Sequence, residues 1–421
     1  MPPEASAPRR ARRSRLLVFL SVLGPGLIAA AAGNEAGGVI TYSSIGASYG
    51  YSMLWLLLLS TFSLIVAQEM GTRMGVVTGK GLADLIREEF GVRVAVFAMV
   101  ILFIANLATT ISEFAGITAA VELFLPPGWR WVRYALIPGV ALLLWLMVTR
   151  GSYRKVERIF LAMCSVFFAY VVAALLSHPN WSEVARQSVR PQLPSTPGYV
   201  PKAIQLIGTT IAPWMQFYVQ SSVRDKGTRT DNYAEARLDV FLGSALSNII
   251  SLFIIVACAA TLFIPHGPTA INLPREAARA LDPLGKWGLI LFGIGLFNAS
   301  AVGAVVVPLS TAYAVTEAIG SESGLGRKVR EAPLFIGIFT ALLVIAVPVV
   351  LRTPERLLFD LIQKAQLING ILLPVILVLM LKLVNNRRIM GKYVNGPIFN
   401  LIAWLTVGLV VALSVASLFA K

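Results

Sequence analysis

The chain has 421 residues, of which 57% are apolar and 14% are charged, and its formal net charge is +15. An average soluble domain has about 25% charged residues, so this chain cannot cover a water-facing surface of its own size. The composition excludes a soluble enzyme, a disordered protein and a secreted disulfide scaffold. It predicts an all-α polytopic membrane protein in which Cys164 and Cys258, both within apolar runs, are small core residues.

Eleven segments are apolar enough for membrane-spanning helices of about 20 residues. In chain order they cover residues 15–46, 52–70, 94–125, 132–149, 156–177, 201–222, 239–264, 286–318, 332–351, 357–383 and 397–420. The first follows a basic arm, residues 1–14, and is interpreted as a retained span because no clean cleavage site follows it. The connection 178–200 shows no periodicity and is expected to be a loop. One integral domain over residues 15–420 is therefore expected.

The basic residues predict the orientation of these spans. If the N-terminus is cytoplasmic, Lys and Arg on the cytoplasmic side outnumber those on the other side by about two to one. This bias follows the positive-inside rule and explains most of the net charge without nucleic acid. With eleven spans, the C-terminus then lies outside, and the expected location is the plasma membrane.

Two spans contain sequences that interrupt a helix. Residues 33–38 of the first span read Gly-Asn-Glu-Ala-Gly-Gly, which combines three glycines with the carboxylate of Glu35. In the sixth span, Pro213 removes a backbone donor and frees the carbonyl near Thr209. At bilayer depth, irregular backbone is tolerated only where it lines a cavity or is buried in protein, and a carboxylate there is a functional-site hypothesis by default.

Two interrupted helices that are five spans apart are typical of inverted-repeat transporters. The predicted architecture is a 5+5 inverted repeat, with repeat one at about 15–177, repeat two at about 201–383, and an extra span at 397–420. Freed carbonyls and helix C-terminal ends carry partial negative charge. Together with Glu35 they favour a cation at the membrane midplane. The alternative is that Glu35 is only a helix-packing carboxylate at a kink.

Several motifs resemble the Nramp family of divalent-metal transporters. They are Gly24-Pro25-Gly26 before a small-residue helix, the stretch 49–55 (Tyr-Gly-Tyr-Ser-Met-Leu-Trp), and the stretch 71–79 (Gly-Thr-Arg-Met-Gly-Val-Val-Thr-Gly). The similarity is densest over residues 24–91 and continues more weakly through the tenth span. The resemblance implies the LeuT-like (APC-type) inverted-repeat fold, which agrees with the predicted spans.

The chain departs from this family at its metal-binding motifs. Where the family has Asp-Pro-Gly-Asn, this chain has residues 35–38, Glu-Ala-Gly-Gly; where the family has Met-Pro-His, it has residues 212–214, Ala-Pro-Trp. A second histidine of the family aligns with Val219, and an aspartate aligns with Thr110. The family's following glutamate is kept as Glu113, and its glutamine ligand is matched by Gln363.

These departures suggest a magnesium-transporting branch related to Nramp. Mg²⁺ takes oxygen ligands and keeps several waters, so loss of the soft thioether and of bulk suits it. Because no histidine lies within a span, and Thr110 replaces the aspartate, the expected transport is not proton-coupled. The expected cargo is the dication itself, Mg²⁺ first and Mn²⁺ second, and no cofactor is expected.

The residues expected at the site fall into three sets. The metal is expected to bind Glu35, Gln363 and the backbone carbonyls of Thr209 and Ala32. Glu113 is a candidate titratable relay. The cavity is expected to be lined by Asn34, Gly37, Gly38, Ala212, Pro213, Trp214, Gln216 and Asn369.

For several polar residues, a role in packing or helix–helix hydrogen bonding remains open beside a role in transport. Gln363 is either a ligand or a helix–helix hydrogen-bonding partner, and Trp214 either walls the cavity or packs in the core. Interhelical hydrogen bonds explain Asn298 and Ser300 better than transport contacts. Lys364 is expected to pair with a carboxylate or to reach an interface.

Other functions also remain open at the level of sequence. Catalytic and nucleotide-binding motifs are missing, so the chain is not expected to be an enzyme. A proton- or sodium-coupled carrier of another cation or of a cationic organic solute would use the same fold. The degraded motifs would also fit a receptor or scaffold that does not transport. The lipid bilayer and the metal are the expected partners, and a monomer is compatible with the sequence.

Overall fold

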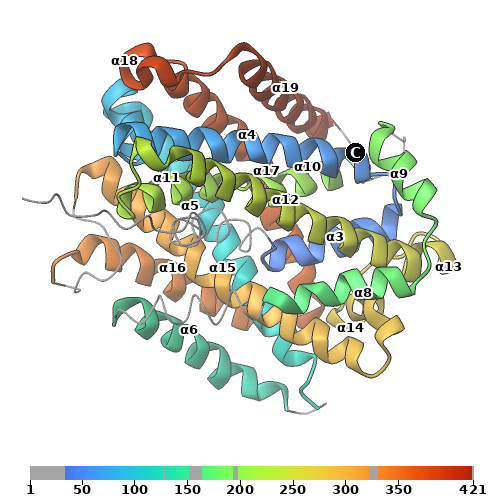
Figure 1. Cartoon of the computed structure of the whole chain (residues 1–421). Helices are drawn as coiled ribbons and strands as arrows, with labels where there is room; N and C mark the ends of the chain where they lie inside the picture. Colours follow the sequence, from blue (N-terminus) through green and yellow to red (C-terminus); the bar gives the residue numbers. More distant parts are fainter. Residues whose placement is uncertain (1–33, 127–128, 151–163, 193–197, 322–329, 420–421) are drawn as a thin grey trace, which may run out of the picture.

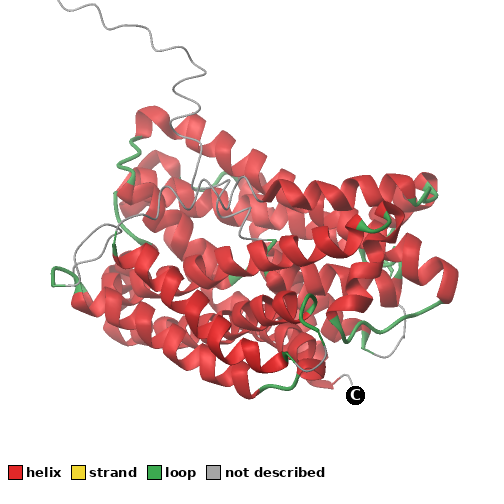
Figure 2. Ribbon diagram, turned by 90° about the horizontal axis from the view of Figure 1, so that it is seen from below, coloured by secondary structure: helices red, strands yellow, loops and turns green. Residues whose placement is uncertain are grey.

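The structure is a computed structural model that describes residues 34–126, 129–150, 164–192, 198–321 and 330–419. Within these ranges every regular element is a helix and none is a strand (Figures 1 and 2). This confirms the all-α prediction. Six helices are long and apolar enough to cross a membrane: Leu54–Thr78, Leu82–Glu122, Thr230–His266, Trp287–Ile319, Pro333–Arg352 and Glu355–Val384.

Three further helical segments are apolar but shorter, at Arg133–Thr149, Ser165–Leu176 and Pro397–Leu413. They coincide with the fourth, fifth and eleventh predicted spans. The first half of the first predicted span, with Ala32, and part of the fifth lie outside the described residues. The count of eleven spans and the repeat boundaries therefore stay predictions.

The first described helix, α3 (Ala36–Tyr49), begins within the glycine-rich sequence of the first span. Glu35 occupies the N-cap position with φ −58° and ψ 176°, so the chain is extended immediately before the helix. Helix α4 (Leu54–Thr78) follows after a short turn. A helix therefore starts at the predicted break, with the carboxylate of Glu35 at its first turn.

Helix α5 (Leu82–Glu122) starts twelve residues before the predicted third span at 94–125. Gly91, with φ 83°, kinks the helix and separates a charged first part from the apolar part. Hydropathy did not reveal the first part because residues 84–93 carry five charged side chains. Helix α5 packs most extensively against α15 (Trp287–Ile319) and α17 (Glu355–Val384), which places its second half in the centre of the bundle (Figure 1).

The connection 178–200, predicted to be a loop, contains helix α9 (Trp181–Val189). Its N-cap is Asn180, whose side-chain oxygen accepts a hydrogen bond from the backbone N–H of Glu183 at 3.2 Å. The loop prediction was wrong for this segment because the helix is short and its start depends on this cap. It follows α6 (Arg133–Thr149) and α8 (Phe168–Leu176) in the chain.

The sixth predicted span is interrupted as expected. Helix α10 (Tyr199–Thr210) ends before Ile211, and α11 (Pro213–Asp225) begins with proline at its first position. Proline suits a first helical position because its missing N–H would have no partner there. The two half-helices face the site with opposite ends of their backbone dipoles.

The second half of the bundle continues with α12 (Tyr233–Cys258). A π-helical turn at Ala259–Phe263 and the short helix α13 (Ile264–His266) follow it directly. The short helix α14 (Pro274–Ala278) precedes α15. Helices α16 (Pro333–Arg352), α17, α18 (Arg387–Met390) and α19 (Pro397–Phe419) complete the chain, with α19 lying beside α4 and α17 (Figure 1).

Candidate metal site at two broken helices

The carboxylate of Glu35 is fully buried at the start of α3. Its Oε1 accepts a hydrogen bond from Gln366 Nε2 on α17 at 3.4 Å. No described residue hydrogen-bonds its other oxygen, Oε2. A buried carboxylate oxygen without a donor is costly, and a cation is the partner that removes the cost most directly.

A second buried carboxylate, Glu113 of α5, lies against the same helix start. Its Oε2 accepts a hydrogen bond from the backbone N–H of Ala36 at 3.3 Å, and its Oε1 has no described partner. Glu113 therefore caps the buried N-terminus of α3, where a negative charge is favourable. A Cβ at Gly303 of α15 would lie 2.5 Å from Glu113 Cδ, so this glycine makes room for the side chain.

A row of neutral polar side chains leads away from Glu35 along α17. The Oε1 of Gln366 accepts a hydrogen bond from Asn369 Nδ2 at 3.1 Å, and Asn369 also bonds Thr109 of α5. A Cβ at Gly37 would lie 1.8 Å from Gln366 Nε2, so the glutamine reaches Glu35 because Gly37 has no side chain. The row contains no group that titrates near neutral pH.

Gln366 also joins the first break to the second. Its backbone carbonyl lies so close to α10 that a Cβ at Gly208 would be 2.2 Å from it. The hydroxyls of Tyr42 on α3 and Thr210 on α10 lie 2.9 Å apart and share a hydrogen bond. The two interrupted helices are therefore packed side by side at the level of their breaks, as expected.

The end of α10 offers unpaired backbone oxygen. The carbonyl of Thr209 would normally accept from the N–H four residues on, but that residue is Pro213, which has none. Ala212 is the N-cap of α11, and both it and Pro213 are buried. The predicted freed carbonyl thus has a structural basis.

The first turn of α11 supplies two buried side chains, Trp214 and Gln216. Neither the indole nitrogen of Trp214 nor either amide atom of Gln216 has a hydrogen-bonding partner among the described residues. The ring of Trp214 makes an edge contact with Tyr218, with centroids 6.2 Å apart. These polar atoms are available to water or to a hydrated ion.

Asn34 points to α12. Its Nδ2 donates to Ser247 Oγ at 3.1 Å, and its Oδ1 accepts from Ser251 Oγ at 3.1 Å. It therefore anchors the broken backbone to a neighbouring helix. Gly38, the residue after Gly37 in α3, is also buried.

The structure does not bring Gln363 to Glu35. The side-chain oxygen of Gln363 accepts a hydrogen bond from Lys202 Nζ at 2.5 Å, while Gln366, one turn further along α17, contacts Glu35. Lys364 forms an ion pair with Asp360 at 2.8 Å, which confirms the expected pairing with a carboxylate.

Other singled-out polar residues have local partners. Thr110 and Ser300 each donate to the backbone carbonyl four residues earlier in their own helix, those of Asn106 and Leu296. Thr110 therefore fills the family's aspartate position with a satisfied hydroxyl. Asn298 is buried in α15.

The site suits a hard cation held by few protein oxygens. Among the described residues, no three His, Cys, Asp or Glu side chains come close enough to hold a metal together. The available oxygens are those of two carboxylates and of a freed carbonyl, which are ligands of the kind that Mg²⁺ and Mn²⁺ take, whereas the Gln366 amide presents its Nε2 to Glu35. With so few direct ligands, the ion would keep part of its water shell.

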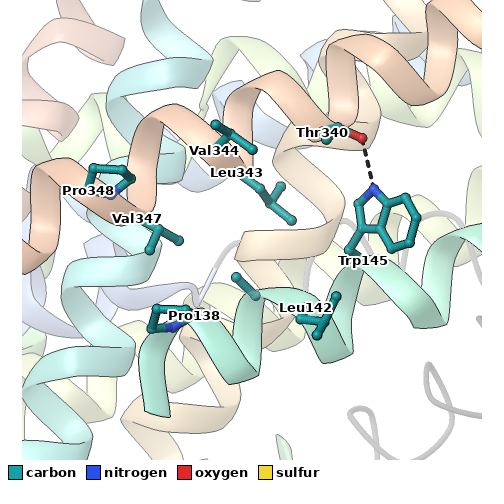
Figure 3. A pocket seen from close by; sticks show the side chains of 9 residues that line it. Pro138, Leu142, Trp145, Thr340, Leu343, Val344, Val347 and Pro348 are labelled. Carbon is teal, nitrogen blue, oxygen red and sulfur yellow. Dashed lines mark hydrogen bonds between the residues drawn. The ribbon is translucent and has the colours of Figure 1, made fainter. Parts of the chain in front are cut away.

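A cavity between α6 and α16, away from Glu35, does not fit a cation (Figure 3). It has a volume of about 420 Å³ and is lined by apolar side chains and by Trp145, whose Nε1 donates to Thr340 Oγ1 at 2.8 Å. No charged side chain lines it. Its lining resembles a lipid-facing groove and not an ion site.

The predicted site residues did not include two that the structure brings forward. Gln366 lies three residues after Gln363, on the same side of the helix and in one polar stripe with Asn369, but only Gln363 and Asn369 were assigned to the site. Lys202 is a cation within the sixth span, and intramembrane cations are rare enough to be noted. Both signals were present in the sequence.

Comparison with known proteins agrees with this architecture. The family model for Nramp, natural resistance-associated macrophage protein-like, matches residues 26–420. A manganese transporter of Eremococcus coleocola, in complex with an aromatic bis-isothiourea substituted compound, has a similar structure, with a TM-score of 0.76, 20% sequence identity, and coverage of 97% of this chain and 88% of that chain.

Two further structures show the same fold. A histidine-to-alanine variant of the Eremococcus transporter gives a TM-score of 0.78 at 20% identity, covering 97% of this chain and 88% of that one. A nucleobase-cation-symport-1 family transporter in a closed conformation gives 0.59 at 13% identity, covering 93% and 89%. The family model extends over nearly the whole chain and includes both breaks. The chain therefore belongs to the Nramp family.

Proposed function

We propose that this protein takes up divalent metal cations by alternating access, with the ion bound at Glu35 between the broken helices. Membership of the Nramp family makes the chain a multi-pass membrane transporter and not an enzyme. The observation that carries the proposal is the buried Oε2 of Glu35, which no described residue hydrogen-bonds. A dication beside it, held also by the Thr209 carbonyl and by water, would satisfy it.

The proposed substrates are Mg²⁺ first and Mn²⁺ second, as in a magnesium-transporting branch related to Nramp. Ala212 occupies the place of the family's methionine, so no thioether faces the site from this position. Thioethers favour soft ions, whereas Mg²⁺ and Mn²⁺ take oxygen. The similarity to the manganese transporter supports a divalent ion in general.

Transport is proposed to be driven by the membrane potential without protons. Thr110 replaces the family's aspartate, and the row from Gln366 to Thr109 contains only amides and a hydroxyl. Both histidines, His178 and His266, lie at helix ends or loops. A dication that crosses 100 mV gains about 4.6 kcal/mol, which concentrates it without a second ion.

The proposed setting is the plasma membrane, with a cytoplasmic N-terminus, an external C-terminus, eleven spans in a 5+5 inverted repeat plus one, and a monomeric unit. The charge bias of the sequence supports the orientation. The interruptions at Glu35 and at Ile211 support the repeat, because they fall in the first and sixth spans.

Uptake into proteoliposomes tests the site. We expect the wild-type protein to carry Mg²⁺ and Mn²⁺, and Glu35→Ala and Glu35→Gln to lose at least nine-tenths of the flux. Glu88→Gln is the matched control, because Glu88 is an exposed carboxylate paired with Lys80. Equal flux in wild type and Glu35→Ala would refute the site, and competition by an organic amine would favour a cationic-solute carrier.

A pH-sensitive dye inside the same vesicles tests the coupling. We expect metal influx under an inside-negative potential with no accompanying acidification. Influx that acidifies the lumen in proportion to the metal carried would refute uncoupled transport and would make Glu113 the first residue to examine as a proton carrier.

A further inference from the structure

Lys202 places an ammonium group among the helices that surround the proposed metal route. It lies in the first turn of α10, where its Nζ donates to Ser44 Oγ on α3 at 2.9 Å and to Gln363 Oε1 on α17 at 2.5 Å. Within the described ranges, no carboxylate lies within ion-pair distance of it, although Asp360 of α17 attracts it from further away. One amine therefore connects three helices through neutral oxygens.

A purely structural role does not account for a lysine at position 202. A cation in the first turn of a helix opposes the helix dipole, and a cation inside a membrane protein is costly. The neighbouring Lys364 shows the ordinary arrangement, since it is exposed and paired with Asp360 at 2.8 Å. A residue kept at such a cost without an ion pair is a candidate for function.

Lys202 lies on the side of the site that the charge bias predicts to be outer. From Lys202 to Thr209, α10 rises about 10 Å, and Gln363 is about 4.5 Å along α17 from Gln366. Further out, the rings of Tyr49 and Tyr199 make an edge contact, with centroids 5.6 Å apart. Along α10, Lys202 therefore lies between this aromatic contact and the break at Ile211.

We propose that the ammonium of Lys202 is a tethered cation on the outer access route, which occupies the Gln363 oxygen until an entering dication displaces it. This inference rests on the proposed function. Lys202 is a positioning residue that sets how tightly external dications bind. A fixed unit charge about 10 Å from a dication weakens binding by about fourfold even in a water-like dielectric.

The test compares Mn²⁺ binding to the full-length detergent-solubilised protein by isothermal titration calorimetry. Lys202→Met keeps the length of the side chain and removes the charge, and we expect its Kd to be at least about fourfold lower than that of the wild type. Lys202→Arg keeps the charge and should bind like the wild type. Lys382→Met, an exposed lysine near the other end of α17, is the matched control and should not change Kd.

The outcomes separate this inference from the proposed function. Wild-type protein that binds neither Mn²⁺ nor Mg²⁺ refutes both. Wild-type binding with equal or weaker binding by Lys202→Met refutes the tethered-cation role alone. If Lys202→Met fails to fold, Lys202→Gln replaces it, with thermal unfolding and gel filtration as checks, and the same fourfold tightening is required.

Discussion

Two buried carboxylates, Glu35 and Glu317, differ in what neutralises them. Glu317 on α15 is 3% exposed, and its Oε1 receives Arg224 Nη1 at 2.8 Å and the Ser221 hydroxyl at 2.7 Å. Glu35 is 0% exposed, and its described hydrogen-bonding partner is the neutral amide of Gln366. The first carboxylate finds its cation in the protein, whereas no described cation pairs with the second, to which we assign the transported ion.

Their positions explain the difference. Glu317 lies where the end of α11 meets α15 and the turn before α5, so closely that a Cβ at Gly81 would be 1.9 Å from its Oε2. The ion pair with Arg224 holds these elements together. Glu35 lies at the start of a half-helix, beside a second interruption. An internally paired carboxylate indicates structure, and one without a cation at a helix break indicates a binding site.

The largest expected contrast is in the stability of the metal-free protein. Glu317→Gln leaves the partly buried guanidinium of Arg224 without its buried partner, and we expect the free energy of unfolding to fall by about 1–3 kcal/mol. Glu35→Gln removes a buried charge that no described cation neutralises, and it should keep or raise the stability. Thermal unfolding in a chelator measures both.

One result of the unfolding measurement would contradict the comparison of Glu35 with Glu317. If Glu35→Gln melts at a lower temperature than wild type without metal, while Glu317→Gln is unchanged, then Glu35 has an internal partner and the two roles are reversed. Glu88→Gln serves as the reference for an exposed carboxylate.

The next expected effect comes from Gly37→Ala. The added Cβ would lie 1.8 Å from Gln366 Nε2, so the amide must leave Glu35. Loss of this hydrogen bond to a charged group should weaken Mn²⁺ binding by about tenfold. The control is Gly337→Ala on α16, where a Cβ meets nothing within 4 Å. Equal binding by both variants would show that Gln366 does not support the site.

A smaller effect is expected from Ala212→Met, which adds the thioether of the family motif at the N-cap of α11. Sulfur favours soft ions, so the preference for Cd²⁺ over Mg²⁺ should rise severalfold. Ala212→Leu adds similar bulk without sulfur and is the comparison. A Cd²⁺ preference that is the same in both variants would indicate that residue 212 does not face the ion.

The sequence contained the information for the breaks because glycine, proline and an intramembrane carboxylate act locally. Residues 33–38 and Pro213 were sufficient to predict where α3 and α11 begin. The start of α5 was missed because charged residues hide a helix from hydropathy. Helix α9 was missed because its formation depends on the Asn180 cap.

The partners of site residues were less predictable, because they depend on the rotation of each helix. Gln363 and Gln366 lie one turn apart on α17, and only packing against Gly37 selects Gln366 as the contact of Glu35. In the same way, the hydrogen bond from Lys202 to Gln363 joins residues 161 positions apart. The spacing of the polar residues on α17 predicts that they share one side of the helix, but it does not predict which of them contacts Glu35.

The most direct measurement is equilibrium Mn²⁺ binding, by isothermal titration calorimetry, to purified wild type, Glu35→Gln and Glu317→Gln at neutral pH. If Glu35 receives its cation from outside, wild type and Glu317→Gln bind one ion with similar Kd, and Glu35→Gln binds at least tenfold more weakly. Binding by Glu35→Gln with the wild-type Kd would contradict the central claim.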